Sequence, residues 1–207
     1  MINLEELEPL LVEDLSKQLL NPRILLDRAR LFDETSRKSL AYNDSTYMPF
    51  YYYLGKYIAP TNVLEFGFRL GLIATCFLTS CKTVNNYLAF QTKTKEFYSS
   101  RIGISNIKDK HKGKLDVWVG DILDNEFEKF ICKVKWDLVI INEEFSYDKH
   151  MDYLEKAWQN MPDGGLLVHD YAIYHQPASD AIKAFAKIKN RKASYIKTRY
   201  GIAMLVK

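Results

Sequence analysis

From residue 62 onward, short apolar runs alternate with longer amphipathic stretches. Five runs have the length and composition of buried strands, and they cover Val63–Phe66, Asn86–Gln91, Leu115–Val119, Trp136–Ile141 and Gly165–His169. The intervening stretches are predicted helices and cover Leu72–Cys81, Thr94–Ile102, Ile122–Cys132 and Tyr147–Met161. Alternating strands and helices indicate an α/β domain with a mostly parallel sheet and helices on both of its faces.

The C-terminal part of the chain extends this pattern. In the fourth helix one face is predicted to carry Tyr147, Met151, Leu154, Trp158 and Met161, and Pro162 and Gly164 follow its end. Pro177 is predicted to start a further helix through Ala181, Ile182, Phe185 and Ile188. Two closing strands, Ala193–Ile196 and Tyr200–Val206, are too close in sequence for a crossover helix, so we expect them to be antiparallel.

Residues 1–60 lack strand signals and are predicted to be an N-terminal helical extension of the α/β domain, which covers 61–207. An apolar stripe runs along the first helix through Leu4, Leu7, Leu11, Leu15 and Leu19, and Pro9 is expected near a helix start or between two short helices. Asn21 and Pro22 predict a second helix through Ile24, Leu25, Ala29 and Leu31, and a third runs from Tyr47 to Ile58. Its aromatic cluster, Phe50 to Tyr53, favours packing over base stacking.

Length and composition indicate an ordinary globular domain. The chain has 207 residues, of which 47% are hydrophobic and 27% charged, enough for one sizeable core. No apolar run is long enough to span a membrane, and the acidic N-terminus does not resemble a signal peptide. Cys76, Cys81 and Cys132 lie in apolar runs without zinc-site spacing, which favours core thiols in a reducing compartment. We therefore expect a cytoplasmic protein with no membrane partner.

The net charge of +3 is unevenly distributed along the chain. The first residues are acidic, whereas lysines and arginines gather between 93 and 114 and again between 183 and 199. Such segments are usually solvated faces, but they also fit a surface that attracts an anionic substrate, nucleic acid included. The apolar stripe of the first helix is a candidate contact for a homo-oligomer.

Polar residues stand at the end of every predicted parallel strand. In open α/β sheets ligands bind at the carboxyl ends of the strands, so these positions are the candidate site. They are Glu65, Gly67 and Gly71 after the first strand, Gln91 after the second, Asp121 and Ile122 after the third, Asn142 to Glu144 after the fourth, and His169 to Tyr171 after the fifth. For Asp121 and Asp170 the alternative is a turn or helix cap.

Three segments resemble motifs of the class I S-adenosylmethionine-dependent methyltransferases, in the O-methyltransferase-like subgroup. Residues 63–71, VLEFGFRLG, look like the subgroup's E-x-G-x-x-x-G turn; WDLVII followed by SYD looks like its FDLIFIDGDHSY segment; and GGLLVHDY looks like its GGLLVVHDY segment. The resemblance covers about residues 62–172. It implies a doubly wound, Rossmann-like, seven-stranded sheet whose last strand is antiparallel.

The resemblance also implies a cofactor and roles for the strand-end residues. Glu65, Gly67, Phe68 and Gly71 would hold the amino-acid end of S-adenosylmethionine, Asp121 and Ile122 would flank the adenine, and Gln91 and Asn142 would complete the cofactor contacts. Asp170 or His169 would act as the base that takes the proton of a hydroxyl or similar acceptor, with His175 as a further candidate. The acceptor is expected to be a small molecule, which the sequence does not identify.

The sequence departs from the family pattern in three places. Gln91 stands where an acidic residue normally accepts from both ribose hydroxyls; the change weakens binding by roughly 1 kcal/mol. Asn142 replaces an aspartate that metal-dependent members use as a ligand, so a tight metal site is doubtful. Arg69 lies inside the glycine turn. These departures leave open a catalytically degenerate binding or scaffold protein. A nucleic-acid methyltransferase is less favoured, since no N/D-P-P-Y/F motif follows the fourth strand.

Overall fold

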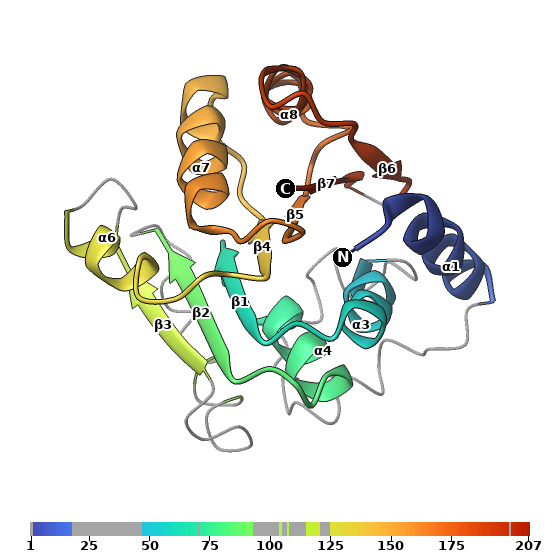
Figure 1. Cartoon of the computed structure of the whole chain (residues 1–207), viewed down its shortest axis with the longest axis horizontal. Coiled ribbons are helices and arrows are strands. Elements are labelled where there is room, and N and C mark those ends of the chain that lie inside the picture. The colour runs from blue at the N-terminus through green and yellow to red at the C-terminus, as the bar shows by residue number, and fades with distance from the viewer. Residues whose placement is uncertain are drawn as a thin grey trace, which may run out of the picture.

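The computed structural model describes residues 2–17, 47–69, 71–92, 104, 107, 115–120, 125–198 and 200–207. Its elements in chain order are α1 (Leu4–Ser16), α3 (Tyr47–Ile58), β1 (Asn62–Phe66), α4 (Leu72–Ser80), β2 (Asn86–Gln91), β3 (Leu115–Val119), α6 (Asn125–Ile131), β4 (Leu138–Ile141), α7 (Tyr147–Asn160), β5 (Leu166–His169), α8 (Gln176–Ile188), β6 (Ser194–Ile196) and β7 (Ile202–Val206). Figure 1 shows their arrangement.

The strands form one seven-stranded sheet in the order β3-β2-β1-β4-β5-β7-β6. Strands β1 to β5 are parallel, whereas β7 is antiparallel to both β5 and β6. The chain first builds outward from β1 to β3 and then returns to add β4 on the other side of β1. The order therefore reverses between β1 and β4, where the carboxyl ends of open α/β sheets bind ligands. This topology confirms the predicted fold class.

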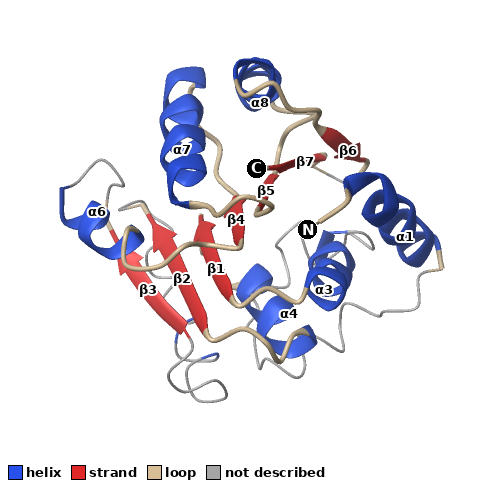
Figure 2. Cartoon of the chain, viewed as in Figure 1, coloured by secondary structure: helices blue, strands red, loops and turns tan. Residues whose placement is uncertain are grey.

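Helices cover both faces of the sheet, with α3 and α4 on one side and α7 and α8 on the other (Figure 2). Alternate residues of each strand supply the two faces because successive side chains point in opposite directions. Val63, for example, packs in the core with α1, α3 and α4, while its neighbour Leu64 packs in the core with α7 and α8. The two cores hold the strand ends rigidly in register.

The predicted bounds of α3, β2 and β3 agree with the structure, and other elements differ by one to three residues. Pro9 neither starts nor divides a helix: α1 continues through it. Since Pro9 and Glu5 are both exposed, the backbone acceptor that proline leaves unpaired is accessible to water. The helices predicted at 21–31 and 94–102, and the basic side chains between 93 and 114, lie outside the described residues.

Burial corrects two further predictions, on the face of α7 and on Cys132. The buried face of α7 consists of His150, Tyr153, Leu154, Ala157 and Trp158, and Tyr147 is 40% exposed. Helix α8 runs as far as Ile188, as predicted, and this last residue is 63% exposed. Cys76 and Cys81 are buried as predicted, but Cys132 is exposed. The sequence periodicity located these helices but did not fix which apolar residues at their ends are covered.

The aromatic cluster of α3 packs inside the protein, as predicted. Phe50, Tyr51 and Tyr53 are buried, and Tyr51 contacts the ring of Phe77 in α4 edge-on, with the ring centres 6.1 Å apart. Helix α1 packs on α3 and reaches β6 and β7. Among the described residues, no helix has both the length and the apolar character needed to cross a membrane.

Candidate functional site

The glycine turn after β1 is held close to the ends of the neighbouring strands. The N–H of Gly67 donates to the carbonyl of Phe90 at 2.8 Å, and its φ of 97° is a left-handed conformation. A Cβ at this position would lie 2.1 Å from the carbonyl oxygen of Asn142. No side chain fits there, so the close approach of β1 and β4 itself requires the glycine.

The rest of the turn leads directly into α4. Gly71 has a φ of 71° and donates its N–H to the carbonyl of Phe68 at 2.7 Å. The ring of Phe68 is only 1% exposed and belongs to the core on the α4 side, so this predicted cofactor contact would involve backbone rather than ring. The N-terminus of α4 consequently lies beside the turn, where its free N–H groups favour an anionic group.

Gln91 lies at the end of β2 and points back to the turn. Its Oε1 accepts a hydrogen bond from the backbone N–H of Arg69 at 2.6 Å, and its Nε2 lies 3.5 Å from Oε1 of Glu143. The side chain is fully buried. The residue predicted to meet the ribose is therefore engaged in holding the turn to the end of β4.

Asn142 links the turn to the N-terminal helices. Its backbone N–H donates to the carbonyl of Phe66 at 2.7 Å, and its side-chain Nδ2 donates to the carbonyl of Gly67 at 3.2 Å. Its Oδ1 accepts from the hydroxyl of Tyr47 at 3.1 Å. All of these groups are buried, so Asn142 fixes the distance between the turn and α3.

Asp170, directly after β5, shares the hydroxyl of Tyr47. Its Oδ2 lies 2.9 Å from that oxygen, and the carboxyl group is fully buried. Burial raises the pKa of Asp170 to about 7, against the opposing influence of Tyr51, Tyr47 and Arg69. Among the described residues, neither Oδ1 of Asp170 nor the nearby hydroxyl of Tyr51 completes a hydrogen bond of normal geometry. Tyr51 therefore influences the pKa of Asp170 without a hydrogen bond of normal geometry to its carboxyl group.

Glu65 is a second buried carboxyl group. Its Oε2 accepts from the hydroxyl of Tyr87 at 2.7 Å, whereas its Oε1 has no hydrogen-bond partner among the described residues. Burial raises the pKa of Glu65 well above its usual value, and the nearby Asp170 and Glu143 add to this effect. Buried polar atoms are rarely left unpaired, so Oε1 marks a place for a donor from a ligand.

His169 belongs to a hydrogen-bonded chain on the other side of the strand. The N–H of Phe145 donates to Nε2 of His150, Nδ1 of His150 lies 3.1 Å from Nε2 of His169, and Nδ1 of His169 lies 2.6 Å from the carbonyl oxygen of Asp170. Only one arrangement satisfies every atom: both rings are neutral and each donates from Nδ1. Burial lowers the pKa of His150 to about 3 and of His169 to about 4.

This chain leaves His169 without a ring nitrogen for an acceptor's proton. Both of its ring nitrogens are engaged within the protein, one of them with the backbone carbonyl of Asp170. His175, the third candidate, lies at the start of α8, with its ring centre 5.8 Å from that of His150. Its Nδ1 is buried and has no hydrogen-bond partner among the described residues, as is also true of Oδ1 of Asp170, so Asp170 and His175 both remain candidate bases.

Arg69 supplies positive charge near the carboxyl groups. Its Nη1 donates to the hydroxyl of Tyr171 at 3.1 Å, and both residues have positive φ, 47° and 62°. Positive φ is costly for residues other than glycine and is often found at functional sites. The guanidinium lowers the pKa of both Asp170 and Tyr171, although burial raises each overall.

Three site residues were not found from the sequence, and two predicted ones cannot be placed. Tyr47, Tyr51 and Tyr87 contribute hydroxyl groups to the buried cluster, yet in the sequence they are ordinary aromatic positions of a helix and a strand. Asp121 and Ile122 lie outside the described residues. Within the described part of the chain, no group of three or more His, Cys, Asp or Glu side chains is arranged to hold a metal ion.

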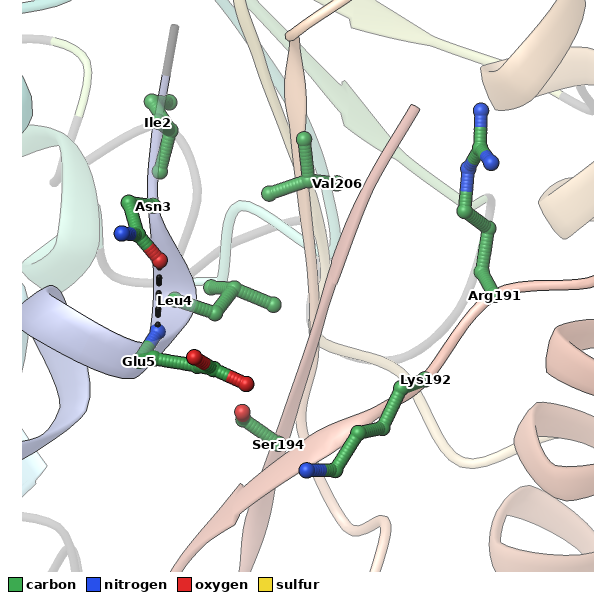
Figure 3. A pocket seen from close by; sticks show the side chains of 8 residues that line it. All are labelled: Ile2, Asn3, Leu4, Glu5, Arg191, Lys192, Ser194 and Val206. Carbon is green, nitrogen blue, oxygen red and sulfur yellow. Dashed lines mark hydrogen bonds between the residues drawn. The ribbon is translucent and has the colours of Figure 1, made fainter.

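A hollow of about 470 Å³ lies elsewhere, between the start of α1 and β6 (Figure 3). Its wall carries Glu5 on one side and Arg191 and Lys192 on the other, and the N–H of Glu5 donates to Oδ1 of Asn3. Val206, which also lines it, pairs with Leu166 at the start of β5. The hollow therefore lies at the opposite edge of the sheet from the carboxyl ends.

Comparison with known proteins finds similarity in structure but not in sequence. No protein-family model matches the chain, and no curated protein sequence matches it significantly. The O-methyltransferase TomG from Streptomyces achromogenes, solved in complex with SAM, matches with a TM-score of 0.68 and 14% identity over 100% of this chain and 99% of TomG. An O-methyltransferase from Bacillus cereus, in complex with SAH, matches at 0.67 and 14% over 90% of each chain.

A SAH-bound methyltransferase from Podospora anserina matches at a TM-score of 0.65 and 12% identity, over 88% of this chain and 86% of that one. The similarity covers between 88% and 100% of this chain in the three cases, at an identity too low to transfer an activity. The fold of this chain is that of the O-methyltransferases.

Proposed function

We propose that the protein is an S-adenosylmethionine (SAM)-dependent methyltransferase that acts on a hydroxyl or similar nucleophile. The observation that carries the proposal is the buried cluster at the carboxyl ends of β1, β4 and β5. There Glu65, Asn142 and Asp170 gather beside Gly67 at the point where the strand order reverses. The solved structures with this fold that carry SAM or SAH support the choice of cofactor.

The residues of the turn fit the amino-acid end of SAM. Oε1 of Glu65 is a buried acceptor without a partner in the described structure, which suits the ammonium group of the cofactor. The N-terminus of α4, after Gly71, suits its carboxylate. In this proposal Gln91 contacts the ribose with the second lone pair of its Oε1, and Asp121 and Ile122 flank the adenine.

SAM supplies an electrophilic methyl group on a sulfonium cation. When SAM is bound, its methyl group would pass to the acceptor oxygen, and Asp170 would accept the proton that this oxygen loses. Oδ1 of Asp170 has no hydrogen-bond partner among the described residues and would face the acceptor's hydroxyl, since Oδ2 faces Tyr47. A base with a pKa of about 7 is well matched to proton transfer near neutral pH. The positive charge of a bound cofactor would in turn favour the ionised forms of the two buried carboxyl groups.

A second candidate is a binding or scaffold protein that keeps the fold without the reaction. The hydrogen bond from Arg69 to Gln91 favours it, because the side chain expected to meet the ribose is already engaged. Both candidates predict a folded, buried cluster. They differ in whether SAM binds and whether any acceptor is methylated.

Isothermal titration with SAM and with its demethylated product SAH tests the proposal. We expect saturable binding of both, and a Glu65→Gln variant should bind about tenfold more weakly because a charge-assisted hydrogen bond is lost. An Asp116→Asn variant is the matched control, since Asp116 is an exposed acidic residue of β3. Absence of heat and of any thermal shift at millimolar ligand would remove the methyltransferase proposal.

A further inference from the structure

Two oxygens from neighbouring strand ends converge on the hydroxyl of Tyr47. Oδ1 of Asn142 lies 3.1 Å from it and Oδ2 of Asp170 lies 2.9 Å from it. Tyr47 is the first residue of α3, far from both in sequence, and it is buried together with them. A point where two buried oxygens meet must be filled by a hydrogen-bond donor or by a cation. Here the phenol fills it.

The hydrogen atoms at this point can be counted. Nδ2 of Asn142 donates to the carbonyl of Gly67, so Oδ1 of Asn142 can only accept. If Asp170 is ionised, two acceptors compete for the single hydroxyl hydrogen of Tyr47. If Asp170 carries a proton on Oδ2, it donates to Tyr47 and Tyr47 donates to Asn142, so every atom is satisfied. The chain Asp170–Tyr47–Asn142 can therefore hold one extra proton with every atom paired.

The surroundings of Asp170 allow both the protonated and the ionised carboxyl group. From α3 it is faced by Tyr47 and Tyr51, from the glycine turn by Arg69, and from β1 by Glu65, while Tyr171 follows it directly. Burial favours the neutral acid, and the guanidinium and the two hydroxyls of α3 favour the anion. The balance is close, with the pKa raised to about 7, so the proton can leave in the neutral range.

A divalent cation does not fit this position. Magnesium and calcium sites are built from several charged oxygens, and only one of the two converging oxygens belongs to a carboxyl group. The third group at the site is a phenol whose own pKa is raised well above 10 by burial and by Asp170, so it offers a neutral oxygen and a hydrogen rather than an anion. In this respect the site differs from the metal sites of the metal-dependent methyltransferases that the sequence resembles.

We propose that Tyr47 is a positioning residue that takes the place of a metal ion: its hydroxyl bridges Asn142 and Asp170 and governs the proton that Asp170 holds. The inference adds to the proposed function and rests on it, because there Asp170 is the base that accepts a proton. Through Asn142 the same chain reaches the carbonyl of Gly67. Loss of the proton thus alters the hydrogen bonding of the glycine turn as well as the strength of the base.

Infrared difference spectroscopy of the whole protein across pH tests the inference without cofactor. The wild type should show a protonated-carboxyl band that disappears with a midpoint near 7 and is missing in Asp170→Asn. In Tyr47→Phe the midpoint should rise by about one pH unit, since a hydrogen bond to the carboxylate is lost. Tyr53→Phe, the same change in a buried tyrosine of α3 that does not contact Asp170, should leave it unchanged.

An unchanged midpoint in Tyr47→Phe, or an equal shift in Tyr53→Phe, would overturn the inference. Titration with Mn²⁺, followed by electron paramagnetic resonance, supplies the second arm. The wild type should bind Mn²⁺ no more tightly than the Asp170→Asn variant does. Tight binding of Mn²⁺ that depends on Asp170 would overturn the inference. If the band behaves as expected but SAM does not bind, the proposed function fails while the role of Tyr47 stands. Variants are compared only if their circular dichroism matches that of the wild type.

Discussion

The side-chain oxygen of Gln91 accepts a hydrogen bond from the backbone N–H of Arg69, at 2.6 Å. The end of β2 therefore clamps the turn that follows β1. A glutamine suits this place because its amide also donates toward Glu143, 3.5 Å away, where a carboxylate would be repelled. The departure from an acidic residue is thus explained by the neighbouring strand end.

The contact between Gln91 and Glu143 predicts the effect of placing an acidic residue at position 91. Gln91→Glu would place two carboxylates side by side in a buried site, and we expect a loss of about 1–3 kcal/mol in the free energy of unfolding at pH 8. Adding Glu143→Gln should recover most of the loss, because the charge then has a neutral amide beside it. Urea denaturation of the two single variants and the double variant measures the coupling. Additive effects would contradict the contact.

Gly67 should tolerate no side chain. Gly67→Ala would bring a Cβ to 2.1 Å from the carbonyl oxygen of Asn142 at a φ of 97°, so we expect a loss of several kcal/mol or failure to fold. Gly165→Ala is the comparison, since its Cβ would meet no atom closer than 3.0 Å. Thermal unfolding measures the two melting temperatures, and that of Gly67→Ala should be the lower. Equal melting temperatures for the two variants would show that β1 and β4 are not so close.

The histidine chain predicts a pH-dependent loss of stability. His150 has its pKa lowered from 6.5 to about 3, so the unfolded chain takes up a proton that the folded protein refuses. Its stabilising contribution is present above pH 6.5 and is lost as pH falls toward the folded value. His150→Gln keeps an acceptor for Phe145 and a donor for His169 but does not titrate. Between pH 6.5 and 4.5 the variant should lose about 2 kcal/mol less than the wild type.

Urea denaturation at both pH values measures this difference. Parallel curves for His150→Gln and the wild type would contradict the neutral chain. The pKa of Asp170 is shifted in the opposite direction, from 3.8 up to about 7. Its contribution to the stability of the folded state is therefore fully present below pH 3.8 and is lost as the pH rises through about 7.

If methyl transfer is found, Asp170 should control its pH dependence. The value of kcat/KM should rise through a midpoint near 7 as the carboxyl group loses its proton. Asp170→Asn should lower kcat by about 10²–10⁴-fold with little change in the affinity for SAM, because general-base catalysis is removed. Steady-state rates with a methyl acceptor, measured between pH 5.5 and 9, decide this. A flat profile in the wild type would exclude Asp170 as the base.

Much of the fold was predictable because the buried parallel strands have short, nearly continuous apolar runs. β2 and β3 were predicted with the bounds that the structure shows, and so was α3 before Pro60. The parallel sheet followed from the alternation of elements, and the location of the candidate site at the strand ends followed from the fold rule for ligand sites. Glu65, Gln91, Asn142 and Asp170 accordingly lie at one edge of the sheet, as the sequence led us to expect.

The partners of these residues were not predictable. Tyr47 lies 95 residues from Asn142 and 123 from Asp170, and nothing in a tyrosine-rich helix distinguishes the one whose hydroxyl meets them. The same limit applies to His150, which is one polar residue of an amphipathic helix until α7 packs against β5. Sequence patterns record which face is apolar, whereas buried hydrogen bonds between distant elements depend on side-chain geometry that the pattern does not contain.

A crystal structure of the protein grown with SAH tests the central claim most directly. The account predicts electron density beside the turn from Gly67 to Gly71, with the amino group of the ligand against Oε1 of Glu65. A Glu65→Gln crystal under the same conditions should show weaker occupancy. Well-ordered crystals at saturating SAH with no ligand at this turn would contradict the account and leave the fold without the methyltransferase site.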